Sequence, residues 1–111
     1  VGAGPAGIFC AWTLAQAGLH PIVLEMGDET RPRIRAVNKF WGDAWELSPE
    51  SNAVFGEGGA GTFSDGKLTS RNRRRAHGLV LGVLRDHGAP EAIEYETKAH
   101  VGTDLLREIV P

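Results

Sequence analysis

The feature that most constrains the fold of this chain is a glycine-rich turn that leads directly into an apolar stretch. Residues 2–7 read Gly-Ala-Gly-Pro-Ala-Gly, and the apolar positions that follow end at Gly18. A turn of this composition before an apolar run is typical of a tight bend that opens a helix. We therefore predict a helix that begins within the glycine-rich turn and ends at Gly18.

A short apolar run after this helix predicts a buried strand. Residues 21–25 read Pro-Ile-Val-Leu-Glu, and Gly27 and Asp28 follow them. Turn, helix and strand in this order form two-thirds of a βαβ unit, the building block of parallel sheets. The fold class is therefore predicted to be α/β, a Rossmann-like parallel sheet with flanking helices.

The two ends of the sequence predict a fragment. Val1 stands where a Met would begin a complete chain, an apolar pattern continues up to Pro111, and most of the strand expected before Gly2 is missing. The length allows one domain at most. We expect residues 1–111 to be a partial domain from the amino-terminal part of a larger protein.

The rest of the chain predicts helices separated by a long loop. We expect a helix over 33–41 with Thr30 as its N-cap, a glycine-rich loop over 42–70, a helix over about 73–87 that ends at Gly88, either a strand or a helical turn over 92–96, and a last helix after Gly102. Long loops in compact domains are usually functional.

Three glycines match the pattern G-x-G-x-x-G. Gly2 permits the tight turn, Gly4 lets the backbone approach a pyrophosphate, and Gly7 allows close packing of helix on strand. The free N–H groups and the positive dipole end of the following helix favour an anion. The pattern therefore predicts a dinucleotide site.

An acidic residue at the end of the expected strand sharpens this prediction. Glu25 stands where its carboxylate would accept hydrogen bonds from an adenosine ribose, and it would repel a 2′-phosphate. NADP is therefore disfavoured at this site. The alternative is a glycine-rich turn before an ordinary helix, with Glu25 as a surface residue.

A second glycine-rich segment begins about 30 residues after Glu25. Residues 55–68 read Phe-Gly-Glu-Gly-Gly-Ala-Gly-Thr-Phe-Ser-Asp-Gly-Lys-Leu. Consecutive glycines let backbone amides face a flavin or a phosphate at close range. The first motif alone suits FAD and NAD equally, and this second segment favours FAD.

These motifs together resemble those of a poorly characterised bacterial family of FAD-dependent dehydrogenases, within the glutathione-reductase-like flavoproteins with two dinucleotide-binding domains. The resemblance covers essentially the whole chain. It implies that Gly2, Gly4, Ala6 and Gly7 contact the FAD pyrophosphate and that Glu25 contacts the ribose. It further implies that the flavin-proximal half of FAD lies against residues of the second segment, namely Gly58, Gly59, Ala60, Gly61 and Thr62.

The sequence departs from the patterns of the FAD-dependent family and of disulfide reductases at one position or motif each. Met26 occupies a position that is often basic in the family. The nearby arginines Arg31, Arg33 and Arg35 are expected to be solvated helix residues, with contact to a phosphate or to the adenine as the alternative. Disulfide reductases carry a Cys pair after a comparable Gly-Gly, whereas the lone Cys10 lies elsewhere and is expected to be a small buried packing residue.

Composition and charge exclude several other classes of protein. A net charge of −2 disfavours a nucleic-acid or anionic-membrane partner, and no Cys/His cluster has metal-ligand spacing. No apolar run approaches the roughly 20 residues needed to span a bilayer. One cysteine forms no internal disulfide, so a cytoplasmic protein is expected. Its substrate is expected to be a small molecule.

Several polar residues have no role that the sequence assigns. Ser64, Asp65 and Lys67 are equally suited to tuning a flavin and to closing a turn. His100 is expected at the edge of the core, with a role as proton donor as the alternative. The basic run of Lys67, Arg71, Arg73, Arg74 and Arg75 is expected to be a solvated surface, with binding of an anion as the alternative.

The combined prediction is an FAD-dependent oxidoreductase that transfers hydride between an unknown substrate and the flavin, with NAD(P)H as a candidate electron donor. No side chain of the chain is predicted to be a catalytic acid or base. An NAD-binding Rossmann dehydrogenase and a non-catalytic flavin- or nucleotide-binding protein are the two alternatives.

Overall fold

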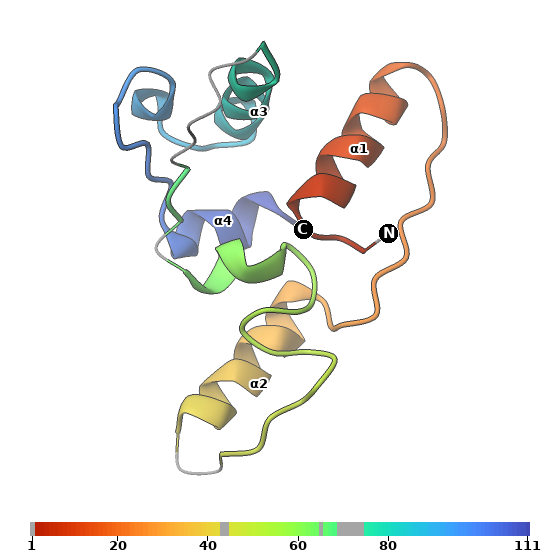
Figure 1. Cartoon of the computed structure of the whole chain (residues 1–111), viewed down its shortest axis with the longest axis vertical. Helices are drawn as coiled ribbons and strands as arrows, with labels where there is room; N and C mark the ends of the chain where they lie inside the picture. The colour runs from red at the N-terminus through yellow and green to blue at the C-terminus, as the bar shows by residue number, and fades with distance from the viewer. Residues whose placement is uncertain (1, 43–44, 65, 69–74) are drawn as a thin grey trace. The chain divides into compact units, whose positions relative to one another are not determined.

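The structure is a computed structural model that describes residues 2–42, 45–64, 66–68 and 75–111, without the side chain of Arg75. Its helices are α1 (Pro5–Gln16), α2 (Thr30–Trp41), α3 (Arg75–Asp86) and α4 (Thr103–Ile109), and its two 3-10 helices are η1 (Gly59–Phe63) and η2 (Glu91–Glu94) (Figure 1). The chain divides into two compact units, residues 1–60 with residue 111, and residues 61–110.

Helix α1 begins and ends as its sequence predicts. Gly4 is the N-cap, with extended backbone angles, and Pro5 occupies the first helical position, where its missing N–H has no cost. Gly18 follows the helix in the left-handed region at φ +77°. None of the residues of α1 is buried within the described chain. The expectation that Cys10 is a buried packing residue was wrong, since its side chain is exposed.

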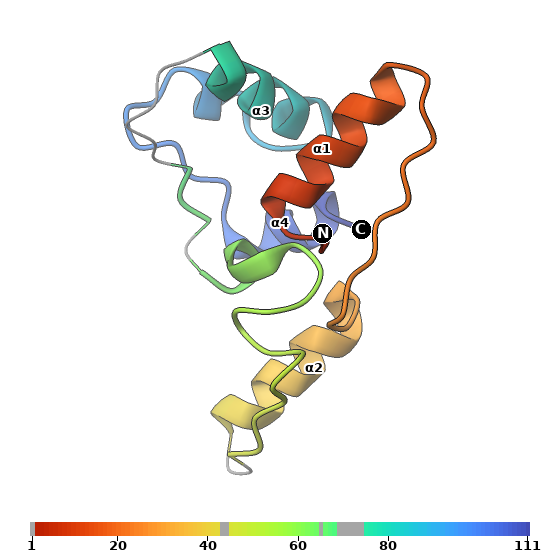
Figure 2. The same cartoon turned by 45° about the vertical axis from the view of Figure 1, so that its right-hand side comes forward.

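The segment after α1 is extended but is not a strand. Residues 19–25 form no ladder with any described residue, and both figures draw them as a plain trace (Figure 2). Ile22 is 88% exposed, so the prediction that this run is buried differs from the structure. A strand requires a hydrogen-bonded neighbour, and the described residues offer none here. The parallel sheet therefore stays a prediction.

Helix α2 starts three residues earlier than its apolar pattern indicates. Its N-cap is Glu29 rather than Thr30, and Thr30 is instead the first helical residue. The buried residues of this helix are Thr30, Arg33 and Val37, which lie on one face at helical spacing. Tertiary contacts of Thr30 and Arg33 therefore select a face that apolarity alone does not reveal.

The second unit is built from α3, η2 and α4. Leu81 and Leu84 of α3 are buried together with Ile93 of η2, and Leu79, which the sequence places inward, is 47% exposed. Residues 92–96 thus begin within a helical turn rather than a strand. The Tyr95 N–H donates to the Ala92 carbonyl within this turn, so it needs no acceptor on a neighbouring strand.

Two main-chain hydrogen bonds form a short antiparallel contact within the second unit. The Leu68 N–H donates to the Ala99 carbonyl at 2.9 Å, and the Val101 N–H donates to the Gly66 carbonyl at 3.0 Å. Gly66 has φ +65°, and a Cβ atom there would lie 2.7 Å from the Gly102 nitrogen. Glycine at position 66 therefore permits both the turn and the close approach of the two backbones.

Some predictions fall on residues that the structure does not describe. Asp65 and the basic residues Arg71, Arg73 and Arg74 lie outside the described residues. The predicted helix over 73–87 corresponds to α3, whose described span is Arg75–Asp86.

Candidate functional site

The Glu25 carboxylate is bound to two main-chain N–H groups. One oxygen accepts a hydrogen bond from the Ala3 N–H at 2.6 Å, and the other accepts one from the Gly27 N–H at 2.9 Å. Ala3 lies inside the glycine-rich turn, 22 residues before Glu25 in the sequence. The residue that the sequence predicts for a ribose therefore lies directly against the turn that it predicts for a pyrophosphate.

These contacts keep Glu25 ionised. The hydrogen bond from Gly27 is the largest cause that lowers the pKa of Glu25 below its ordinary value; partial burial opposes it, and the Ala3 and Met26 amides and the charge of Arg33 act in the same direction as Gly27. Hydrogen bonds to the charged form favour that form. The carboxylate is thus a fixed negative acceptor at neutral pH.

Gly2 and Gly4 have different local reasons for being glycine. A Cβ atom at Gly2 would lie 2.7 Å from the Glu25 Oε2 atom, so a side chain there would push the carboxylate away. A Cβ atom at Gly4 would meet no atom within 4 Å. The protein itself therefore leaves room for a side chain at Gly4, and the backbone there faces open space.

The second glycine-rich segment packs against the first. The Gly58 N–H donates to the Ala3 carbonyl at 2.7 Å, so the same residue binds Glu25 through its N–H and the segment through its carbonyl. Gly59, at φ +64°, lies against α1, where a Cβ atom would be 3.1 Å from the Pro5 ring. The two glycine motifs are therefore joined at the start of α1.

Arg33 holds the second segment from the other side. This residue is completely buried, and its guanidinium donates to the carbonyls of Asn52 at 2.7 Å, Glu57 at 2.5 Å and Gly59 at 2.8 Å. The planar guanidinium has donors in a fixed fork, which suits several carbonyl acceptors at once. The expectation that Arg33 is a solvated surface residue was wrong.

Glu57 returns a contact to α2. Its carboxylate accepts hydrogen bonds from the Thr30 N–H at 2.7 Å and from the Thr30 hydroxyl at 2.6 Å. The negative charge lies at the helix start, where free N–H groups and the helix dipole favour it. Thr30 thus binds the side-chain carboxylate of Glu57, whereas Arg33, one turn later on α2, binds the main-chain carbonyl of Glu57.

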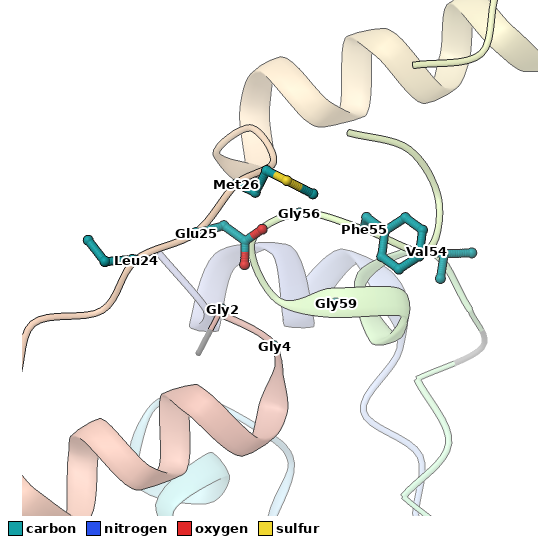
Figure 3. Close-up of a pocket in the computed structure, with 9 residues that line it drawn as sticks. All are labelled: Gly2, Gly4, Leu24, Glu25, Met26, Val54, Phe55, Gly56 and Gly59. Carbon is teal, nitrogen blue, oxygen red and sulfur yellow. The ribbon is translucent and has the colours of Figure 1, made fainter. Parts of the chain in front are cut away.

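The two motifs line a cavity of about 350 Å³ in the first unit. Figure 3 shows the Glu25 side chain reaching from the extended segment toward Gly2 and Gly56, with Phe55 and Val54 on the far side of Gly56 from Glu25. The complete lining is Gly2, Gly4, Leu24, Glu25, Met26, Val54, Phe55, Gly56 and Gly59. One carboxylate within a mostly apolar, glycine-lined wall is the usual composition of a small-molecule site.

The start of α1 contributes unused donors beside this cavity. In an α-helix the first N–H groups have no acceptor within the helix, and here Ile8 is the first residue of α1 whose N–H reaches back, to the Gly4 carbonyl at 3.0 Å. Ala6 is exposed and Gly7 is half-buried in this first turn. The turn therefore presents main-chain donors of the kind that bind phosphate.

The remaining predicted residues are placed differently. Gly58 is buried and Ala60 is exposed, whereas Gly61 and Thr62 belong to the second unit. Thr62 is 1% exposed, and its carbonyl accepts a hydrogen bond from the Arg107 Nε at 2.9 Å. Of the ten predicted cofactor residues, the cavity lining contains four: Gly2, Gly4, Glu25 and Gly59.

The residues without an assigned role lie outside the cavity lining. Ser64 is exposed, with its hydroxyl 3.5 Å from the Gly61 carbonyl. Lys67 and His100 are both exposed and face each other across an isolated antiparallel bridge. The expectation that His100 lies at the edge of a core therefore differs from the structure.

Sequence reasoning missed other residues that shape the cavity. Phe55 and Gly56 belong to the predicted glycine segment, but they were not named as cofactor residues. Arg33 was expected to be solvated, and no local pattern contradicts that expectation, because the burial of the face that carries Thr30, Arg33 and Val37 arises from tertiary contacts.

Among the described residues, no three His, Cys, Asp or Glu side chains are grouped so as to hold a metal ion. Within the same residues, every helix is too short or too polar to cross a membrane.

Comparison with known proteins points to the same region of the chain. Residues 1–53 match the family described as NAD(P)-binding Rossmann-like domain, which supports nucleotide binding and an α/β fold for this segment. The chain is also similar to an uncharacterised protein of Clostridium beijerinckii, at 56% identity over 110 residues. The match covers 99% of this chain but 20% of that relative, so the chain spans about a fifth of its relative's length.

Proposed function

We propose that this chain forms the dinucleotide-binding part of an FAD-dependent oxidoreductase, and that the complete protein is longer. The observation that carries the proposal is the hydrogen bond of 2.6 Å between the Ala3 N–H and the Glu25 carboxylate. It joins a turn suited to pyrophosphate with an acceptor suited to ribose hydroxyls. The match of residues 1–53 to Rossmann-like nucleotide-binding domains supports this assignment.

The residues of the cavity fit an adenosine diphosphate group. The open space beside Gly4 and the free amides at the start of α1 would receive the pyrophosphate. The Glu25 carboxylate would accept hydrogen bonds from the ribose hydroxyls, and its negative charge would exclude a phosphate on that ribose. Gly56 and Gly59 would let the opposite wall lie close to the ligand.

We favour FAD over NAD because of the second glycine segment. A nicotinamide dinucleotide needs the turn and Glu25 but gives no reason for a glycine-rich wall joined to that turn through Gly58. The resemblance of residues 55–68 to FAD-dependent dehydrogenases supports the same choice. The family description of residues 1–53 favours NAD(P) as the second candidate.

Bound FAD would supply hydride chemistry at the flavin ring. The residues of this chain would bind and orient the cofactor: the α1 turn through its amides, Glu25 through its carboxylate, and the glycine segment through its backbone. We further propose NAD(P)H as the electron donor, a small molecule as substrate, no nucleic-acid or membrane partner, and the cytoplasm as location. The acid or base that acts on the substrate would lie outside this chain.

The test is the visible spectrum of the complete protein that contains this sequence. A purified yellow protein with flavin absorbance that bleaches when NADH or NADPH is added without oxygen would support the proposal. A folded, colourless protein that binds NAD would establish the second candidate instead. A flavin that no reductant reduces would contradict the enzyme assignment and favour a structural flavin.

Two glycine-to-alanine substitutions distinguish an effect on ligand binding from an effect on folding. The Gly4→Ala side chain meets no protein atom, so the protein should fold normally but lose dinucleotide affinity because the methyl group occupies the ligand side. The matched control is Gly78→Ala in α3, where a Cβ atom also meets nothing within 4 Å. Equal dinucleotide affinity in both variants would contradict pyrophosphate binding at Gly4.

A further inference from the structure

We infer that Arg33 is the positioning residue of the site, and that its guanidinium sets the distance between the glycine-rich wall and Glu25 at which a dinucleotide is held. This inference rests on the proposed function. It concerns a residue that lines no part of the cavity itself and that acts through the main chain of the second glycine segment.

The guanidinium spans the whole part of the segment that lines the cavity. Its Nε donates to the Asn52 carbonyl, and its terminal nitrogens donate to the carbonyls of Glu57 and of Gly59, which itself lines the cavity. Val54, Phe55 and Gly56 are the lining residues between these anchor points. One rigid side chain therefore fixes both ends of the wall.

The approach of Arg33 to the wall is close. Gly56 has φ +121°, and a Cβ atom there would lie 2.6 Å from the Arg33 Cδ atom. The aliphatic part of Arg33 thus packs directly under Gly56 while its head binds the flanking carbonyls. The same segment is also held by main-chain hydrogen bonds: the Glu57 N–H donates to the Asp28 carbonyl at 3.2 Å, and the Gly58 N–H donates to the Ala3 carbonyl at 2.7 Å.

Burial makes these contacts energetically important. Arg33 is 0% exposed, and a buried charge is stable only where it is hydrogen-bonded or paired. Its acceptors include the main-chain carbonyls of Asn52, Glu57 and Gly59, which lie in or beside the wall. Movement of these residues would break hydrogen bonds of a buried cation, and that cost opposes the movement.

Lysine is not an adequate replacement. A lysine ammonium is a single donor centre, whereas the three acceptors of Arg33 are reached from three different nitrogen atoms. Arg35 lies two positions further along α2 and is exposed. It provides a matched control with the same side chain on the same helix.

The experiment compares the complete holoprotein with its Arg33→Met, Arg33→Lys and Arg35→Met variants. FAD binding is measured by quenching of flavin fluorescence, and amide hydrogen exchange is followed in peptides covering 52–59 and α1. Arg33 lines no part of the cavity, so its loss should act on affinity through the position of the wall, and a loss of about 1.4 kcal/mol of binding free energy corresponds to roughly a tenfold rise in Kd. We expect at least this rise for Arg33→Met, a smaller rise for Arg33→Lys, and none for Arg35→Met.

The exchange measurement separates positioning from general instability. We expect faster exchange in 52–59 of Arg33→Met with unchanged exchange in α1. The inference is overturned if Arg33→Met binds FAD as the wild type does, or if exchange rises equally throughout the chain. Should Arg33→Met fail to fold, Arg33→Lys decides by the same two measurements. A wild-type protein that binds neither FAD nor NAD would overturn the proposed function itself, an outcome visible before any variant is made.

Discussion

Ala3 and Glu25 form the central contact of this molecule: the main-chain N–H of the one donates to the carboxylate of the other at 2.6 Å. The Ala3 carbonyl accepts in turn from the Gly58 N–H at 2.7 Å. A single residue of the glycine-rich turn therefore connects the acidic residue on one side with the second glycine segment on the other.

Glu25→Gln should weaken dinucleotide binding. The amide keeps the shape of the side chain but loses the charge, and hydrogen bonds to a charged group are worth about 1.5–3 kcal/mol. We expect roughly a tenfold to hundredfold rise in Kd, measured by titration with FAD and with NAD. The exposed Glu96→Gln is the control, and an equal affinity of the two variants would contradict the role of Glu25.

The affinity of the wild type should depend on pH only in the acid range. The pKa of Glu25 is lowered in the folded protein, first by the Gly27 hydrogen bond, so the stabilisation is present above the unfolded pKa of about 4.3 and is lost as the pH falls through the lower folded value. We expect Kd to be constant from about pH 8 to pH 5 and to rise below that range. An affinity that already falls between pH 7 and pH 6 would indicate a different titrating group.

Gly2→Ala should disrupt the site through Glu25. The new methyl group would lie 2.7 Å from Glu25 Oε2, so the carboxylate has to leave the Ala3 N–H. We expect a smaller lowering of the Glu25 pKa, seen by NMR titration, because the Ala3 hydrogen bond is lost while Gly27 still donates to the other oxygen, together with weaker dinucleotide binding. Gly78→Ala provides the contrast, since alanine in an open helix position stabilises by roughly 0.5–1 kcal/mol.

Glu57→Ala should destabilise the start of α2. It removes the acceptor of both the Thr30 N–H and the Thr30 hydroxyl, and loss of such a helix-start contact costs about 0.5–2 kcal/mol. We expect a lower Tm and faster amide exchange in the first turn of α2. Glu46→Ala removes an exposed ion pair with Lys39 and should leave Tm unchanged. Equal Tm values for the two variants would show that Glu57 does not hold α2.

Gly66→Ala should destabilise the second unit. Position 66 combines φ +65° with a Cβ position 2.7 Å from the Gly102 nitrogen. Gly88, at φ +107°, has the unusual backbone without the close contact, and alanine in the left-handed region costs about 1–2 kcal/mol. We therefore expect Gly66→Ala to lower Tm more than Gly88→Ala. The reverse order would mean that the backbones at 66 and 102 are not in contact.

The local sequence was sufficient to predict most helices. Helix α1 follows from a glycine N-cap, Pro5 and the break at Gly18, all of which act within a few residues. The end of α2 at Trp41 and the position of α4 after Gly102 were also predicted. The strand over 21–25 was not confirmed, because strand formation depends on a distant partner that local patterns do not specify.

The candidate site likewise has features that the local sequence predicts and features that depend on tertiary contacts. The sequence by itself predicted Gly2, Gly4 and Glu25 as dinucleotide-binding residues, because each follows from a pattern with a known physical purpose, and these three residues line one cavity. Only the tertiary structure decided that Arg33 is buried rather than solvated and that it binds the carbonyls of Asn52, Glu57 and Gly59. Every residue has a main-chain carbonyl, so no residue type in the sequence indicates which carbonyl will be bound. A side chain that recognises them can therefore be identified only when folding has brought it beside them.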